Sequence, residues 1–503
     1  MAMPIFRATA RHGLRAVGYF LAGGFVVAVV GLVWHLNGRP DLEVWHTADL
    51  TEEFRARSDV DSFAEYLALE DRLFAQLREE VYDQMDPVDR RDIARYHAGS
   101  LSDPERWPRN WNRSFELGAA DPRAGVLLLH GMSDSPYSLR SLGERLHAEG
   151  ALVVGLRIPG HGTAPSGLVD VEWEDMAAAV RIAVRHLRER VGDRPLLLVG
   201  YSNGAALAVE YSLAALENAE LPMPAQLVLL SPEIGLTRLA ALAVWQERLG
   251  HLLGLEKLAW NSILPEYDPF KYGSFALNAG KQAYRITVEI GAQIARLGAA
   301  GALERFPPTL GFQSVVDATV SAPALVTGLF DPLPAAGGHE LVLFDINRLL
   351  DVEMLLRRDP AGWIDGMLTG ARPTFTVCAV MNESEETADV VIRRLGVGEQ
   401  EHTTQPLDLR WPRDVYSLAH VALPFAPDDP VYGGPQAGKS PGIQLGELVL
   451  RGERGVLEIG ASDLLRLRWN PFYPYVEQRV VEALDAIAPR RSATMGSESA
   501  RNE

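Results

Sequence analysis

Four continuous apolar runs, separated by stretches with helical periodicity, constrain the fold of this chain more than any other feature. The runs are "RAGVLLLHG", "GALVVGLRIPGHG", "RPLLLVGYSNG" and "AQLVLLSPE", within residues 123–233. The helical stretches between and after the first three are "SPYSLRSLGERLHAEG", "VEWEDMAAAVRIAVRHLRERVG" and "AALAVEYSLAALENA". Strands without alternating polarity are buried on both sides, and alternation with amphipathic helices is typical of parallel sheets. We therefore expect an α/β fold with a mostly parallel sheet flanked by helices.

The third run ends in a serine between two glycines, Gly200-Tyr201-Ser202-Asn203-Gly204. In a sharp strand-to-helix turn, larger residues beside the serine would strike the neighbouring strand and helix. The apolar strand before Ser202 and the small-residue helix after it supply the context for such a turn. The pattern predicts that Ser202 is a nucleophile, which needs a base to take its proton.

A nucleophilic serine also needs donors directed at the oxyanion that forms. The first apolar run ends at His130-Gly131, and the loop then turns into a helix. We expect the backbone N–H groups of Met132 and Asn203 to form this oxyanion hole. His130 precedes the serine in the chain, so we expect it to hold the loop rather than to act as the base.

Three motifs, "LLLHGMSDSPYSLRSLGERL", "LRIPGHGTAP" and "GYSNG", resemble the α/β-hydrolase superfamily. More narrowly they are similar to its carboxylesterase and monoacylglycerol-lipase-like branch, which also includes serine-aminopeptidase-like sequences. The resemblance covers residues 123–236 closely and extends loosely to "PFAPDDPVYGG". It implies the α/β-hydrolase fold and a catalytic order of serine, acid and histidine, the last two after later strands.

The acid and the base each have more than one candidate. Asp317 follows the strand-like "PPTLGFQSVV", where the resemblance places the acid, and Asp345 and Glu383 remain alternatives. For the base we favour His420, because "RDVYSLAHVALPF" has strand character and would deliver it to the sheet edge. His339 competes, but its own strand follows it.

The chain divides into five expected regions. They are a basic cytoplasmic stub with a transmembrane anchor at 1–36, a charged helical stalk or linker at 37–110, a hydrolase domain at 111–488 with a helical cap at about 233–306, and a disordered tail at 489–503. The anchor is expected because Ala16–Trp34 has no charge and follows three arginines. The arginines place the catalytic domain on the extracytoplasmic (periplasmic) side.

The composition of the chain argues against some classes of binding partner and cofactor. A net charge of −18 argues against a nucleic-acid partner. The one cysteine, Cys378, lies in the apolar run "TFTVCAVM" and is expected to be a buried small side chain. No Cys/His cluster has metal-ligand spacing, so we expect no metal and no organic cofactor. The oligomeric state is left open.

These features favour a membrane-anchored serine hydrolase that cleaves small-molecule or lipid-like carboxylic esters. A serine-aminopeptidase-like peptidase is the alternative, with Glu233 or Glu266 as the carboxylate that would hold a free amino terminus. A third possibility is a non-catalytic binding or assembly module with a hydrolase fold. Ser202, an acid and a histidine are all available, which favours the enzyme.

Overall fold

The computed structural model describes residues 19–490, apart from 22, 25, 28–29, 32–33, 35, 236–255, 351, 357–358, 370–373 and 449–456. The expected cytoplasmic stub, the disordered tail beyond residue 490 and the first part of the expected cap therefore lie outside the described residues. Within the part described, no helix is both long enough and apolar enough to cross a bilayer.

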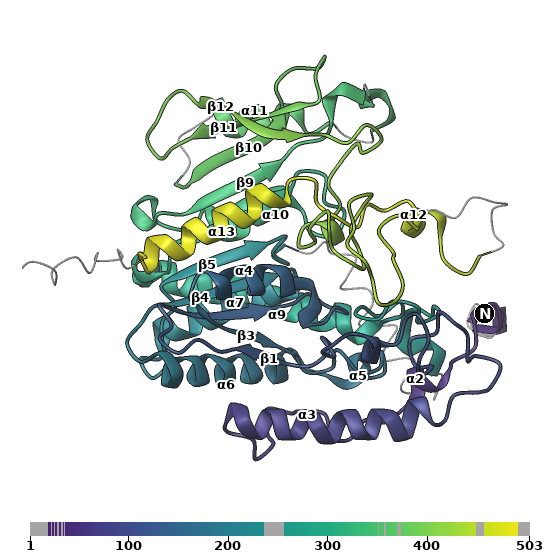
Figure 1. The fold of residues 1–503 in the computed structure, drawn as a ribbon. Coiled ribbons are helices and arrows are strands. Elements are labelled where there is room, and N and C mark those ends of the chain that lie inside the picture. The colour runs from purple at the N-terminus through teal and green to yellow at the C-terminus, as the bar shows by residue number, and fades with distance from the viewer. Residues whose placement is uncertain are drawn as a thin grey trace, which may run out of the picture.

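A ten-stranded sheet forms the centre of the molecule, in the order β1-β3-β2-β4-β5-β8-β9-β10-β11-β12 (Figure 1). Its strands are β1 Phe115–Leu117, β2 Gly125–Leu129, β3 Leu152–Leu156, β4 Leu196–Tyr201, β5 Gln226–Leu230, β8 Thr309–Ser314, β9 Glu340–Phe344, β10 Thr376–Asn382, β11 Asp389–Leu395 and β12 Thr403–Arg410. All pairings from β3 across to β10 are parallel, and β1, β11 and β12 pair antiparallel. The expected mostly parallel α/β sheet is confirmed.

Helices cover both faces of this sheet. The longer ones are α3 Phe63–Leu77, α4 Arg140–Ala148, α6 Trp173–Val191, α7 Asn203–Glu217, α9 Leu277–Ala299, α11 Ala361–Thr369 and α13 Tyr473–Ile487, and the short ones are α2 Val44–Thr47, α5 Gly167–Asp170, α10 Ala322–Leu325 and α12 Ala461–Leu464. Helices α3, α6, α7 and α9 share one core cluster with one face of the strands, while α4 and α13 share a second cluster with the other face. Cys378 on β10 is buried, as expected.

The segment 37–110 is part of the domain rather than a separate stalk. Its main helix, α3, contributes Phe63, Tyr66 and Leu69 to the core cluster that α6 and α7 share. Much of the rest of the segment is turns and irregular chain. The sequence pattern predicts α3 correctly, and the buried face of this helix is apolar apart from Glu70.

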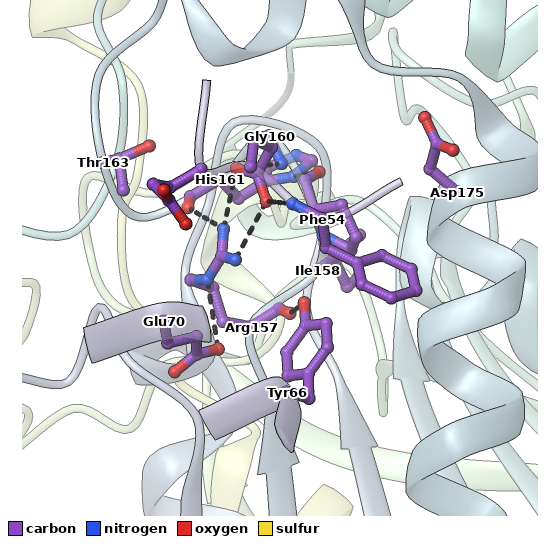
Figure 2. A network of polar contacts seen from close by, with 12 residues as sticks. Phe54, Tyr66, Glu70, Arg157, Ile158, Gly160, His161, Thr163 and Asp175 are labelled. Atoms are coloured by element: carbon purple, nitrogen blue, oxygen red, sulfur yellow. Dashed lines mark hydrogen bonds and ion pairs between the residues drawn. The ribbon is translucent and has the colours of Figure 1, made fainter. Parts of the chain in front are cut away.

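A buried ionic network holds this segment against the loop after β3 (Figure 2). Arg157 forms ion pairs with Glu53 at 2.9 Å and with Glu70 at 3.1 Å, and all three side chains are nearly inaccessible to solvent. The Tyr66 hydroxyl donates to the Arg157 carbonyl at 2.7 Å, and the Gly160 N–H donates to Glu53 at 2.9 Å. The segment and the loop thus fold as one unit.

The described part of the expected helical cap is only partly helical, since one long helix, α9, follows mostly irregular chain. Residues 256–276 form a short 3₁₀ helix, a small two-stranded sheet (β6 Trp260–Ser262 and β7 Phe275–Ala276) and irregular chain. Helix α9 packs beside the sheet against α7, and buries Ile286 and Ile290 there. The apolar face of α9 is therefore buried against α7 at the side of the domain.

Strands β10, β11 and β12 extend the sheet beyond β9, at the top of Figure 1. The sequence pattern predicts β9 and β10 but misses β11 and β12. The prediction that His420 directly follows a strand is wrong, because β12 ends at Arg410 and residues 413–419 form turns and irregular chain. The apolar residues of this stretch, such as Leu418 and Leu423, are buried in a loop instead of a strand.

Candidate active site

Ser202 lies in a strained turn between β4 and α7. Its φ of 53° and ψ of −117° place a non-glycine residue in a region that side chains rarely occupy. Its N–H donates to the Leu230 carbonyl at 2.9 Å, and its own carbonyl accepts from Ala205 and Ala206 at the start of α7. The serine is thus held at the carboxyl edge of the parallel strands.

The two glycines of the motif are required by close backbone approach. A Cβ at Gly200 would overlap the backbone of Ala205, and one at Gly204 would overlap the carbonyl of Leu129. Strand β4, helix α7 and the end of β2 meet so closely that no side chain fits between them. This is the physical reason for the pattern on which the Ser202 prediction rests.

His420 joins Ser202 to Asp317. Its Nε2 lies 3.0 Å from Ser202 Oγ, and its Nδ1 lies 2.7 Å from Asp317 Oδ2. In the neutral tautomer that suits both contacts, Nδ1–H donates to the carboxylate and Nε2 accepts from the hydroxyl. Ser202 and His420 are 5% and 6% exposed, so this chain of hydrogen bonds is nearly shielded from water.

Asp317 is held as a carboxylate by its surroundings. Burial alone would raise its pKa, but His420 and the backbone N–H groups of Val320 and Thr319 outweigh burial and hold the pKa of Asp317 below its usual value. Gln313 Nε2 also donates to Asp317 Oδ2 at 3.0 Å. The carboxylate is therefore both ionised and fixed in orientation.

The alternative acids and the alternative base lie elsewhere. His339 precedes β9, at the opposite edge of the sheet from Ser202, and burial lowers its pKa to about 4. Asp345 forms an ion pair with Arg348 at 3.0 Å. Glu383 is exposed after the end of β10. The structure brings none of these side chains to Ser202.

The loop that carries Met132 passes directly against the serine. A Cβ built at Gly131 would lie 3.1 Å from Ser202 Cβ. Asn203 is the first residue of α7. The prediction that the N–H groups of Met132 and Asn203 form the oxyanion hole is consistent with this arrangement.

His130 connects this loop to the loop after β3. Its Nε2 accepts from the Ile158 N–H at 3.0 Å, and its Nδ1–H donates to the Gly131 carbonyl at 2.9 Å. Burial, followed by the neighbouring His161, lowers the pKa of His130 well below its usual value. A neutral imidazole with both nitrogens occupied fits the structural role expected for it.

Sequence reasoning missed several side chains around the site. Tyr201 places its hydroxyl 3.5 Å from the His420 carbonyl, Gln313 holds Asp317, and Asp134 forms an ion pair with Lys271 at 2.7 Å. Gln313 is the penultimate residue of β8, so its polar side chain inside an apolar strand was the one available signal. The Asp134–Lys271 pair joins residues too far apart in the sequence to be seen as a motif.

The two carboxylates considered for binding an amino group differ in their surroundings. Both Glu266 oxygens accept hydrogen bonds, from the N–H groups of Gly273 and Ser274. Glu233 is fully buried, and its Oε2 has no hydrogen-bond partner among the described residues. Burial and the charge of Asp317 raise the pKa of Glu233 to about 8. Its N–H donates to the Ser202 carbonyl, so only Glu233 stands beside the nucleophile with a free oxygen.

Comparison with known proteins gives a family match. Residues 120–268 match the family described as serine aminopeptidase, S33, which confirms the resemblance to α/β-hydrolases. Over 85 residues the chain is 32% identical to a thermostable monoacylglycerol lipase from Bacillus sp. (strain H-257). This stretch is 17% of the chain and spans about a third of that lipase.

Solved structures similar to this fold include two monoacylglycerol lipases. That of Paleococcus ferrophilus is 19% identical with a TM-score of 0.34, over 46% of this chain and 88% of its own. A soluble variant of the Saccharomyces cerevisiae monoglyceride lipase is 15% identical with a TM-score of 0.35, over 46% of this chain and 82% of its own.

Proposed function

We propose, from the match of residues 120–268 to the family described as serine aminopeptidase, S33, that the chain is a serine hydrolase that cleaves carboxylic esters. The observation that carries the proposal is the continuous hydrogen-bonded line from Ser202 Oγ through His420 to Asp317. In this geometry the hydroxyl can act as the nucleophile of acyl transfer, the imidazole as its base, and the carboxylate as the group that orients the imidazole.

In the proposed mechanism, His420 Nε2 takes the proton from Ser202 Oγ as that oxygen attacks the acyl carbon of the ester. Asp317 stabilises the imidazolium that forms and keeps its ring oriented. The N–H groups of Met132 and Asn203 stabilise the oxyanion. His420 then gives its proton to the departing alcohol, which leaves an acyl group on Ser202. Water, activated by the same imidazole, releases the acid and restores the serine.

An aminopeptidase-like activity is the second candidate, and Glu233 is the observation that favours it. A buried carboxyl with one unpartnered oxygen could pair, once ionised, with the ammonium group of a substrate. The raised pKa of Glu233, about 8, argues against this role, because the carboxyl is neutral at neutral pH. We therefore place ester cleavage first.

The deciding experiment compares the parent chain with Ser202→Ala, His420→Ala and His339→Ala on p-nitrophenyl esters of increasing acyl length and on aminoacyl p-nitroanilides. We expect ester turnover that falls by about a thousandfold or more in the first two variants. His339→Ala serves as the matched control and should keep most of the activity. If the parent neither hydrolyses any ester nor reacts with a fluorophosphonate, the chain has a hydrolase fold without hydrolase activity.

We also propose that the N-terminal segment anchors the protein in a membrane, with the catalytic domain on the extracytoplasmic side. The uncharged stretch Ala16–Trp34 and the arginines before it support this proposal. So do the apolar side chains of the segment that the domain leaves uncovered: Tyr19, Phe20 and Val27 are 77%, 80% and 72% exposed.

A further inference from the structure

A cavity of about 250 Å³ lies beside the triad. Its charged lining residues are Asp134, Asp268, Asp463, Lys271, Arg466 and Arg468, and Val421 also lines it. Val421 directly follows His420 in the chain. A Cβ built at Gly131 would lie 3.1 Å both from Asp134 Oδ2 and from Ser202 Cβ, so Asp134 joins the cavity to the nucleophile. A substrate group next to the scissile ester can enter this space.

Two of the three cations around the cavity are balanced by acids. Lys271 Nζ lies 2.7 Å from Asp134 Oδ2. Arg468 lies 3.9 Å from Asp268 and donates to the Tyr267 hydroxyl at 3.2 Å. Within each pair the charges of the base and the acid largely cancel. Several N–H groups of Lys271 and Arg468 still remain free to donate.

Arg466 is the cation without such a partner. Its Nη2 donates only to the Thr319 hydroxyl at 3.4 Å, and within the described residues no carboxylate lies within ion-pair distance of it. Thr319 is itself next to the Asp317 turn, whose Oδ1 accepts its N–H at 2.8 Å. The Arg466 guanidinium therefore lines the cavity without an ion pair, although the carboxylate of Asp463 lines the same cavity.

We propose that this cavity binds an anionic group, a carboxylate or a phosphate, carried by the ester substrate, with Arg466 as its main partner and Lys271 as a second donor. The planar guanidinium fork matches both kinds of anion. The net charge of −18 repels anions at long range, so a local cation is what an anionic substrate would need. This inference rests on the proposed esterase function and names its substrate class.

The test uses the full chain and four p-nitrophenyl esters of equal acyl length: a neutral alkanoate, and esters that end in a carboxylate, a phosphonate or an ammonium group. We expect kcat/KM for one or both anionic esters to exceed that for the neutral ester by about tenfold. Comparing the carboxylate with the phosphonate ester identifies the preferred anion. The ammonium ester, which an amino-binding site would favour, should be the poorest substrate.

The variant Arg466→Gln should lower kcat/KM for the preferred anionic ester about tenfold or more and change that for the neutral ester less than about twofold. Arg466→Lys should restore part of the preference, and Arg410→Gln, at the exposed end of β12, is the matched control. Equal losses on both esters, or no anionic preference in the parent, would overturn the inference while the neutral turnover upholds the esterase. Failure of every ester and of fluorophosphonate labelling would overturn both.

Discussion

Ser202 combines a strained backbone conformation with the proposed role of nucleophile. A non-glycine residue in this backbone region costs roughly 1–3 kcal/mol, which the surrounding elements must offset. Here the Leu230 carbonyl, the start of α7 and the tight contact at Gly204 fix the turn. The strain holds Oγ at the hydrogen-bonding distance from His420 before any substrate arrives.

At the same scale, Glu233 makes stability depend on pH. Its pKa rises from 4.5 in the unfolded chain to about 8 in the folded one. Between these values the folded state keeps a proton that the unfolded state loses, so the free energy of unfolding falls as pH rises from about 4.5 to 8. We expect Glu233→Gln to remove this dependence and to make the protein more stable than the parent at pH 8, on the order of a few kcal/mol.

Urea unfolding of both proteins at pH 5, 6.5 and 8 measures this effect. Glu304→Gln, at an exposed position, is the control and should follow the parent at every pH. Parallel curves for Glu233→Gln and the parent would show that Glu233 is ionised in the folded protein.

Only some residues of the candidate site can be predicted from the sequence. Ser202 could be predicted because the turn that holds it is local in sequence. Asp317 was predicted from the strand before it together with the family resemblance, which left Asp345 and Glu383 open. Gln313 and Arg466 could not be found, because each matters through a contact that only the folded chain makes.

Among the elements, the crossing of β2, β4 and α7 is the tightest. We expect Gly204→Ala to push α7 away from Leu129, to lower the free energy of unfolding by about 1–3 kcal/mol and to reduce ester turnover sharply. The control is Gly291→Ala on the exposed side of α9, where a Cβ meets no atom within 4 Å. That variant should gain about 0.5–1 kcal/mol from helix propensity. Thermal unfolding and ester turnover of both variants provide the comparison.

The ionic network between α3 and the loop after β3 gives a second prediction for an element. Arg157→Leu leaves Glu53 and Glu70 buried without their cation, so we expect a loss of about 3–5 kcal/mol. Arg72→Gln breaks the exposed pair with Glu52 and a hydrogen bond to the Ala68 carbonyl, and it should cost less than about 1 kcal/mol. Denaturant unfolding checks both. Equal small losses would mean that the segment 37–110 is held by its apolar contacts alone.

The elements that sequence predicts well are those with a strong period and short connections. The parallel strands from β2 to β5 and the helices between them fall where the apolar runs place them. The strand expected before His420 is wrong because its apolar residues were assigned to a regular element, whereas the structure buries them in a loop.

The proposed anchor predicts that the protein is found in the membrane fraction and not in the supernatant. The full chain should sediment with membranes and resist extraction at alkaline pH. Replacing Val26 and Val27 by Asp adds about 2.5–3.5 kcal/mol per residue to insertion and should release the protein. Val288→Asp, at a half-exposed site on α9, is the control and should leave sedimentation unchanged. A parent chain that stays in the supernatant would contradict the anchor.

The three outer strands have a consequence for how activity is acquired. His420 and Asp317 are 103 residues apart in the chain, and β9 to β12 lie between them. Closing so long a loop is entropically costly and comes after local contacts form. A chain whose parallel centre has folded but whose outer strands have not would present Ser202 without its base. During refolding, ester turnover should therefore appear later than the burial of β4 and α7. The recovery of activity then measures the rate of the last folding step.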